Sequence, residues 1–180
     1  MAAPHPWELD VEGAAKAMSM SPDGALVAVG GRNLFRLAAV AGGQLTDVRS
    51  VRAPARSRSS LNWATNDIRW HPQLQCKHLL ASAATNGAII LWNLGQGSGS
   101  LARSGVRQTV LGGKGGGTQK RQGHTQQANR VCWHGAGGDP KLLLSAAQDG
   151  IVKLWDTDNQ QLVNNFRPRP NDAVRDVQFR

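Results

Sequence analysis

The sequence predicts an all-β protein built from repeated units of about four short strands. Its clearest sign is an internal repeat without gaps, in which residues 79–95 (LLASAATNGAIILWNLG) align with residues 142–158 (LLLSAAQDGIVKLWDTD). Both copies contain a turn signal ending in glycine and then a short run ending in tryptophan, as strands joined by tight turns do. The composition agrees, because 21 glycines, six Trp and no Tyr suggest turn-rich β structure with Trp at packing positions. A repeat of this length indicates a repeat architecture.

The first unit is expected over residues 15–50, after an N-terminal tail at residues 1–14. A weaker copy of the repeat lies at residues 17–39 (AMSMSPDGALVAVGGRNLFRLAA), where Ala38 stands at the position that Trp occupies in the other copies.

The second unit is expected over residues 66–122. Its strands are predicted in NDIRWH, KHLLASAA and AIILW, with the turn signal TNG before the last of these. The unit includes residues 95–122, which are rich in Gly, Ser and basic residues. We interpret this insertion as a flexible loop with one strand inside.

The third unit is expected over residues 123–167, and a fourth begins at residues 173–180. The predicted strands of the third unit are NRVCWH, KLLLSAA, IVKLW and QLVNNF, with the turn signal QDG between the second and the third strand. AVRDVQF at 173–179 matches the first strand of the earlier copies, so the sequence predicts the first strand of a further unit there.

Four-stranded units at a period near 40–50 residues that end in Trp-Asp are the signature of WD-repeat propeller blades. The sequence resembles that family, and KLWD at 153–156 is its namesake motif. The resemblance implies about three four-stranded blades plus the first strand of a fourth. A closed propeller has about four to eight blades, so we expect an open arc of marginal stability with unpaired edges, and a fragment or short form of a longer protein.

The same resemblance implies a buried hydrogen-bonded tetrad in the third blade, and a partial one in the second. The first is formed by His124, Ser145, Asp149 and Trp155. The second retains Ser82, Asn86 and Trp92, with Leu61 where the His belongs. Ser145, His124 and Asp149 could also be read as a hydrolase triad. The structural interpretation explains more, since it accounts for the spacing, the Trp and the partial copy 63 residues earlier, and Ser145 has no G-x-S-x-G elbow.

No other residues indicate catalysis, a cofactor or a metal ion. Two cysteines, Cys76 and Cys132, supply neither a disulfide framework nor a set of zinc ligands. His71 and His134 end predicted first strands at matching positions, which favours a role in the repeat framework. We therefore expect a protein that is not an enzyme and has no small-molecule substrate.

The charge is high and uneven, with a formal net charge of +9 and no Asp or Glu from residue 68 to residue 138. Two basic stretches are candidate contacts for an anionic partner: Arg49, Arg52, Arg56 and Arg58 in the first, and Arg103, Arg107, Lys114, Lys120 and Arg121 in the second. They are either solvated loops or sites for phosphate or acidic peptides. Neither interleaves aromatic residues with the cations, which weakens the case for nucleic acid.

Four segments resemble, more closely, a family of WD-repeat subunits of the second GATOR complex: VAVGGRNLFRLAAV, NDIRWHP, LLASAATNGAIILWNLG and DAVRDVQF. This similarity covers residues 15–180 except 96–122. It implies a non-catalytic protein-interaction scaffold in amino-acid signalling to mTOR complex 1. Its partners would be other protein subunits, among them WD-repeat proteins of a GATOR-type complex. That family also has a zinc-binding RING-like domain, which two cysteines cannot form.

Two other functions stay open. The first is a generic WD-repeat adaptor in ubiquitin, trafficking or RNA-processing machinery, and the second is a basic propeller that binds nucleic acid. The longest apolar runs fall far short of the ~20 residues that cross a bilayer, and the first ten residues lack the pattern of a signal peptide. We expect a cytoplasmic protein, peripheral at the lysosomal membrane by the family resemblance.

Overall fold

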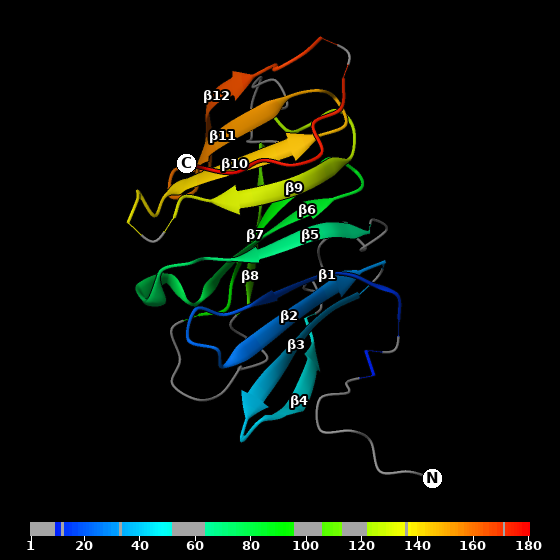
Figure 1. Cartoon of the computed structure of the whole chain (residues 1–180), viewed down its shortest axis with the longest axis vertical. Helices are drawn as coiled ribbons and strands as arrows, with labels where there is room; N and C mark the ends of the chain where they lie inside the picture. Colours follow the sequence, from blue (N-terminus) through cyan, green and yellow to red (C-terminus); the bar gives the residue numbers. More distant parts are fainter. Residues whose placement is uncertain are drawn as a thin grey trace.

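The computed structural model describes residues 10–11, 13–32, 34–51, 64–95, 106–112, 122–135, 137–170 and 172–180, apart from the side chains of residues 47–49. Within these ranges twelve strands form three four-stranded antiparallel sheets (Figure 1). Strands follow one another in chain order across each sheet, and each strand pairs antiparallel with its neighbours. We call the sheets blades 1, 2 and 3. They do not close into a ring, which confirms the predicted all-β, unclosed propeller architecture.

Blade 1 is made of β1 (Ala15–Met20), β2 (Leu26–Gly31), β3 (Leu34–Ala41) and β4 (Gln44–Ser50). Its hairpins use the turn chemistry of the sequence. In the first, Asp23 accepts hydrogen bonds from the Ser21 hydroxyl and the Ala25 N–H, and the pKa of this carboxyl falls to about 2. Ala38, at the predicted Trp position, is buried on β3.

Blade 2 is made of β5 (Thr65–Trp70), β6 (Leu79–Ala84), β7 (Ile89–Asn93) and β8 (Arg107–Leu111). A short 3₁₀ turn, η1 (Leu74–Cys76), precedes β6. The fourth strand lies inside the predicted insertion, where β8 pairs along the full length of β7. The two strands are therefore neighbours in space although a long, glycine-rich stretch of sequence separates them.

Blade 3 is made of β9 (Ala128–Trp133), β10 (Leu142–Ala147), β11 (Val152–Asp156) and β12 (Gln161–Phe166). These strands coincide closely with the predicted runs. Gly150, in the turn before β11, has a φ of 75°. This left-handed backbone is one that glycine adopts at little cost.

The segment predicted to begin a fourth unit forms no strand, because no neighbouring strand pairs with it. Residues 172–180 instead run extended across blade 3 (Figure 1). The Val174 N–H donates to the Ala147 carbonyl, and the side chains of Val174, Val177 and Phe179 pack on the cluster around Leu144. We call residues 172–180 the terminal segment.

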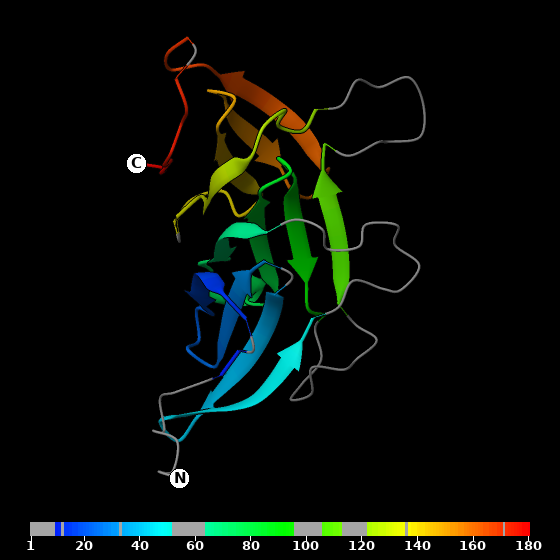
Figure 2. The same ribbon diagram turned by 90° about the vertical axis from the view of Figure 1, so that its right-hand side faces the viewer.

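Two apolar layers hold the blades together. The layer between blades 1 and 2 contains Phe35 stacked on Trp92 at 4.2 Å, and the layer between blades 2 and 3 contains Trp133 and Trp155. The first strands β1, β5 and β9 follow one another along the inner side of the arc. Figure 2 shows the fourth strands β8 and β12 on the opposite side of the sheets.

Each blade has two unlike faces. We call the face toward the preceding blade its rear face and the face toward the following blade its front face. The last residues of β1, β5 and β9 are Met20, Trp70 and Trp133, and all three point to rear faces. The two tryptophans are buried, whereas Met20 is 57% exposed and Met18, two residues before it, is 71% exposed. On the rear face of blade 1, the positions of Met18 and Met20 are therefore open to solvent, whereas the equivalent positions of the other blades are buried.

Candidate functional site

A buried chain of four side chains runs through the rear face of blade 3. The indole Nε1 of Trp155 donates to Ser145 Oγ at 2.8 Å, and this oxygen lies 2.8 Å from Nε2 of His124. The other imidazole nitrogen, Nδ1, lies 3.2 Å from both carboxylate oxygens of Asp149. The structure thus brings together all four residues of the predicted tetrad, from β10, β11, the turn between them and the segment before β9.

One arrangement of protons satisfies every member of this chain. Because the Trp155 N–H occupies Ser145 Oγ, the serine hydroxyl donates to Nε2 of His124, and its Nδ1–H donates to Asp149. Burial lowers the pKa of His124, which keeps the ring neutral. Burial also acts to raise the pKa of Asp149, but hydrogen bonds led by the Thr125 N–H outweigh it and leave that pKa lowered.

Ser145 has the hydrogen-bond partners of a triad serine but not its accessibility. Its relative exposure is 0%, and its oxygen already accepts the Trp155 indole N–H. A nucleophile must reach a substrate carbonyl, so a serine sealed between two blades favours a role in packing over hydrolysis.

Blade 2 retains only part of this arrangement. Trp92 Nε1 donates to Ser82 Oγ at 2.9 Å, inside the layer shared with blade 1. Asn86 takes no part, since its side-chain oxygen accepts the Ala88 N–H within the turn. Leu61, at the position where a tetrad His is expected, lies outside the described residues.

Lys153 is a buried cation that the sequence analysis did not single out. Its Nζ donates to the Gln122 carbonyl at 2.7 Å and lies 5.9 Å from the ring centroid of Trp155. Burial lowers the pKa of this amine. Lys153 therefore ties the chain just before the tetrad histidine to the strand that carries the tetrad tryptophan.

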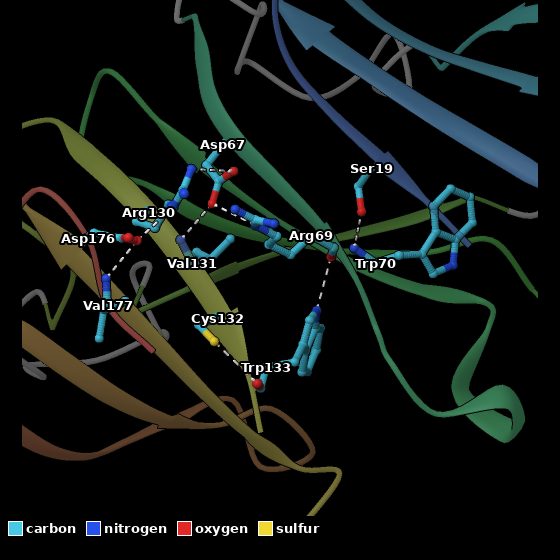
Figure 3. Close-up of polar contacts among 10 residues, drawn as sticks. All are labelled: Ser19, Asp67, Arg69, Trp70, Arg130, Val131, Cys132, Trp133, Asp176 and Val177. Atoms are coloured by element: carbon cyan, nitrogen blue, oxygen red, sulfur yellow. Dashed lines mark hydrogen bonds and ion pairs between the residues drawn. The ribbon is translucent and has the colours of Figure 1, made fainter. Parts of the chain in front are cut away.

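The inner strands also receive polar groups from neighbouring blades. Each is the first strand of its sheet, so one of its edges has no strand beside it, and such edges invite pairing with other chains. The Trp70 N–H donates to the hydroxyl of Ser19 on β1 at 2.9 Å, and the Val131 N–H donates to the carboxylate of Asp67 on β5 at 3.1 Å (Figure 3). Side chains thus cap the amides of these open edges.

Carbonyl groups of the inner strands are capped in the same way. The indole Nε1 of Trp133 on β9 donates to the Arg69 carbonyl of β5 at 3.0 Å (Figure 3). In the opposite direction, the Asn66 amide donates to the Ala128 carbonyl of β9 at 2.8 Å. Blades 2 and 3 are therefore joined by reciprocal side-chain-to-backbone bonds as well as by apolar packing.

Four charged groups surround these caps (Figure 3). Asp67 lies 3.3 Å from Nε of Arg69 and 3.6 Å from Nη1 of Arg130, whose Nε donates to Asp176 at 2.8 Å. Burial raises the pKa of Asp67, although the Val131 N–H and both guanidinium groups act to lower it. The chain of charges runs from blade 2 through blade 3 to the terminal segment.

A hollow of about 370 Å³ opens beside this network. Its lining includes Arg69, Trp70, Arg130, Cys132, Trp133 and Asp176. The lining combines two tryptophans with two arginines, a combination that suits a partially polar protein surface.

His71 joins blade 2 to the loop that precedes β10. Its Nδ1 accepts the Gln73 N–H, so Nε2 carries the proton and donates to the Pro140 carbonyl at 3.0 Å. Its ring lies 4.7 Å from that of Trp133, and burial lowers its pKa. These contacts give His71 a position in the framework between two blades.

The candidate anion contacts are scattered or undescribed. Arg107 is exposed at the start of β8, and Arg49 lies on β4 with its side chain undescribed. Arg52, Arg56, Arg58, Arg103, Lys114, Lys120 and Arg121 lie outside the described residues.

Sequence reasoning missed Asp67, Arg130 and Asp176, the charged residues that link neighbouring blades. A usable signal was present, because each lies three residues before the aromatic residue that ends its copy of the repeat (Trp70, Trp133 and Phe179). Within the described ranges no group of three or more His, Cys, Asp or Glu side chains could hold a metal ion, and no helix is long and apolar enough to span a bilayer.

Comparisons with known proteins agree with the fold. Residues 117–156 match the family model described as "WD domain, G-beta repeat". GATOR2 complex protein WDR24 of Homo sapiens is 33% identical over 165 residues, which cover 92% of this chain and 18% of that protein. The protein of the same name from Xenopus laevis gives the same identity and coverage, and the Drosophila melanogaster protein is 27% identical over 169 residues.

This chain therefore spans less than a fifth of the length of the relatives it matches. Its three four-stranded sheets and its matched repeat are consistent with a partial WD-repeat propeller. The chain thus has an unclosed, propeller-like architecture, matches the WD-repeat model over residues 117–156 and resembles GATOR2 complex protein WDR24 over 92% of its own length.

Proposed function

We propose that this chain is a non-catalytic interaction scaffold within a GATOR2-type complex. The supporting observation is the similarity to GATOR2 complex protein WDR24 across 92% of the chain. The structure is compatible with such a role: its chemically capable serine is sealed between blades, and its open inner edges are capped by side chains. The tetrad then acts as a packing device that keeps blade 3 rigid.

The role extends, by the family resemblance, to amino-acid signalling to mTOR complex 1 at the lysosomal membrane. In this proposal the blades form a platform whose partners are other subunits of the complex, including WD-repeat proteins. The exposed rear face of blade 1, with Met18 and Met20, supports the platform role because large apolar side chains in solvent mark contact surfaces.

Affinity capture of the endogenous protein tests this proposal, with an antibody against the 95–122 insertion and mass spectrometry of the captured material. Washes at about 0.15 M and about 1 M salt, where the Debye length falls from ~8 Å to ~3 Å, separate contacts by their dependence on charge. We expect GATOR2-type subunits at both salt concentrations. Recovery of ubiquitin, trafficking or RNA-processing proteins without those subunits would overturn the proposal and favour a generic adaptor.

The formal charge of +9 favours a second candidate, a propeller that binds nucleic acid. Phosphate contacts weaken steeply as salt rises, because binding releases condensed counterions. Nucleic acid that is captured at the lower salt concentration, lost at the higher one and removed by nuclease would support this reading. GATOR2-type subunits that remain bound after nuclease treatment would exclude nucleic acid as the bridge.

A further inference from the structure

The three successive inner segments carry a charged residue at one equivalent position, and its sign alternates. Asp67 lies three residues before the end of β5, and Arg130 lies three residues before the end of β9. Asp176 lies three residues before Phe179 in the terminal segment. The sign is therefore negative, positive and negative along the arc.

The terminal segment sits on blade 3 as β9 sits on blade 2. The Asn66 amide donates to the Ala128 carbonyl at 2.8 Å, and the Asn129 amide donates to the Val174 carbonyl, also at 2.8 Å. In each pair the donor and the acceptor occupy equivalent positions of successive units. The same side-chain amide-to-carbonyl hydrogen bond thus occurs at both interfaces.

The aromatic contacts repeat as well. The ring of His71 lies 4.7 Å from that of Trp133, and the ring of His134 lies 4.5 Å from that of Phe179. These amide and ring contacts recur at both interfaces, although Phe179 lacks the indole N–H with which Trp133 bonds the Arg69 carbonyl. The charged pair differs in sign, since Asp67 of blade 2 faces Arg130, and Arg130 of blade 3 faces Asp176.

We propose that this alternating charge decides which inner segment docks on which blade. The front face of blade 3 selects an acidic segment through Arg130, and its occupant is the terminal segment of this chain. The front face of blade 2 selects a basic segment through Asp67. If the terminal segment docked on blade 2 in place of β9, Asp176 would lie beside Asp67, and like charges held side by side oppose pairing. This inference does not depend on the proposed function.

A native thiol reports on the docking. Cys132 lies on the front face of blade 3, is partly buried, and lines the same hollow as Asp176, Val177 and Gln178. Release of the terminal segment uncovers this thiol and raises its rate of alkylation. Cys76, beyond the contacts of the segment, serves as an internal reference in the same sample.

The test compares Asp176→Arg with Asp172→Arg in the full 180-residue chain. Asp172 is exposed on the same segment and has no ion pair among the described residues, so it provides the same charge change without the contact. An exposed pair contributes about 0.2–1 kcal/mol, and reversal replaces attraction with repulsion. We expect Asp176→Arg to raise the alkylation rate of Cys132 by about two- to tenfold, while Asp172→Arg leaves it near the wild-type rate.

Two further measurements separate charge selection from a general loss of packing. At about 1 M salt, where the Debye length is ~3 Å, the difference between the two variants should shrink. A synthetic peptide of residues 172–180, added to the Asp176→Arg protein, should slow alkylation of Cys132, whereas the same peptide with Arg at position 176 should not. Equal rates in both variants, a difference that salt does not change, or equal protection by both peptides would overturn the inference.

Discussion

Removal of the Ser145 hydroxyl is the sharpest test of how the tetrad stabilises the protein. In the wild type this oxygen accepts the Trp155 indole N–H, and its proton goes to Nε2 of His124. Ser145→Ala leaves both partners buried without the group that pairs them. A buried polar group left unpaired costs about 1–3 kcal/mol. The free energy of unfolding should therefore fall by about 2–6 kcal/mol, a large fraction of the ~5–15 kcal/mol typical of whole domains.

Blade 2 offers a matched control. Ser82 accepts the Trp92 indole N–H at 2.9 Å, and among the described residues no imidazole pairs with it. Ser82→Ala therefore leaves one buried donor unpaired, where Ser145→Ala leaves two groups. We expect a loss of about 1–3 kcal/mol for Ser82→Ala. Both substitutions remove a buried hydroxyl from equivalent positions of neighbouring blades. The difference between their stability losses therefore reports on the second unpaired group alone.

Urea titration followed by far-ultraviolet circular dichroism is the suitable assay, because the tryptophans next to the mutations would alter a fluorescence signal. The midpoint and the slope give the free energy of unfolding for each variant. A Ser145→Ala variant that loses no more stability than Ser82→Ala would refute the argument that the Ser145 hydroxyl pairs two buried groups. If it kept wild-type stability but lost a measurable hydrolytic turnover, the triad interpretation would have to replace it.

Three other perturbations have expected results. Burial lowers the pKa of both His71 and His124 below the free value of 6.5, so unfolding takes up protons and the free energy of unfolding should fall as pH drops through 6.5. Urea titrations across this pH range should show a shallower pH dependence of stability in His71→Gln. A pH dependence equal to that of the wild type would contradict the lowered pKa of His71. Asp67→Ala leaves the Val131 N–H without its acceptor and should cost about 1–3 kcal/mol, whereas Asp67→Asn keeps an acceptor and should cost less in the same titration. Gly150→Ala forces a Cβ onto a backbone with φ of 75° and places that atom 2.7 Å from the Asp172 carbonyl oxygen. The substitution should cost at least ~1 kcal/mol of stability and lower the melting temperature. An unchanged melting temperature would mean that the turn adapts.

The repeat in the sequence predicts the strands because each copy carries its own turn chemistry. The TNG and QDG signals place glycines at positions 87 and 150, and both adopt the positive φ that their turns require. The runs that end in Trp92 and Trp155 become the third strands of their blades. Local periodicity and local turns suffice here, since each hairpin forms between neighbouring segments of the chain.

The inter-blade contacts could not be predicted in the same way. In the sequence, Asp67 looks like an ordinary polar residue of a half-buried strand. Its structural role is to accept the hydrogen bond from the Val131 N–H of the next blade. The sequence predicts one strand inside the 95–122 insertion but not its position, because a segment without regular periodicity separates β8 from its partner β7. The terminal segment reads as a strand from its alternation. It forms none because strand assignment needs a paired neighbour, and its contacts come mostly from side chains.

The unlike faces of the blades restrict how such molecules can associate with one another. A two-fold dimer joins a surface to its own copy, but the two ends of this arc are unlike, because blade 1 exposes Met18 and Met20 on its rear face and the terminal segment lies over the front face of blade 3. Any contact that joins one end of the arc to the other end of a second copy is heterologous, running head to tail. Such contacts either close into rings or grow into filaments, so light scattering that rises with protein concentration without a plateau at two copies is the expected signature of self-association.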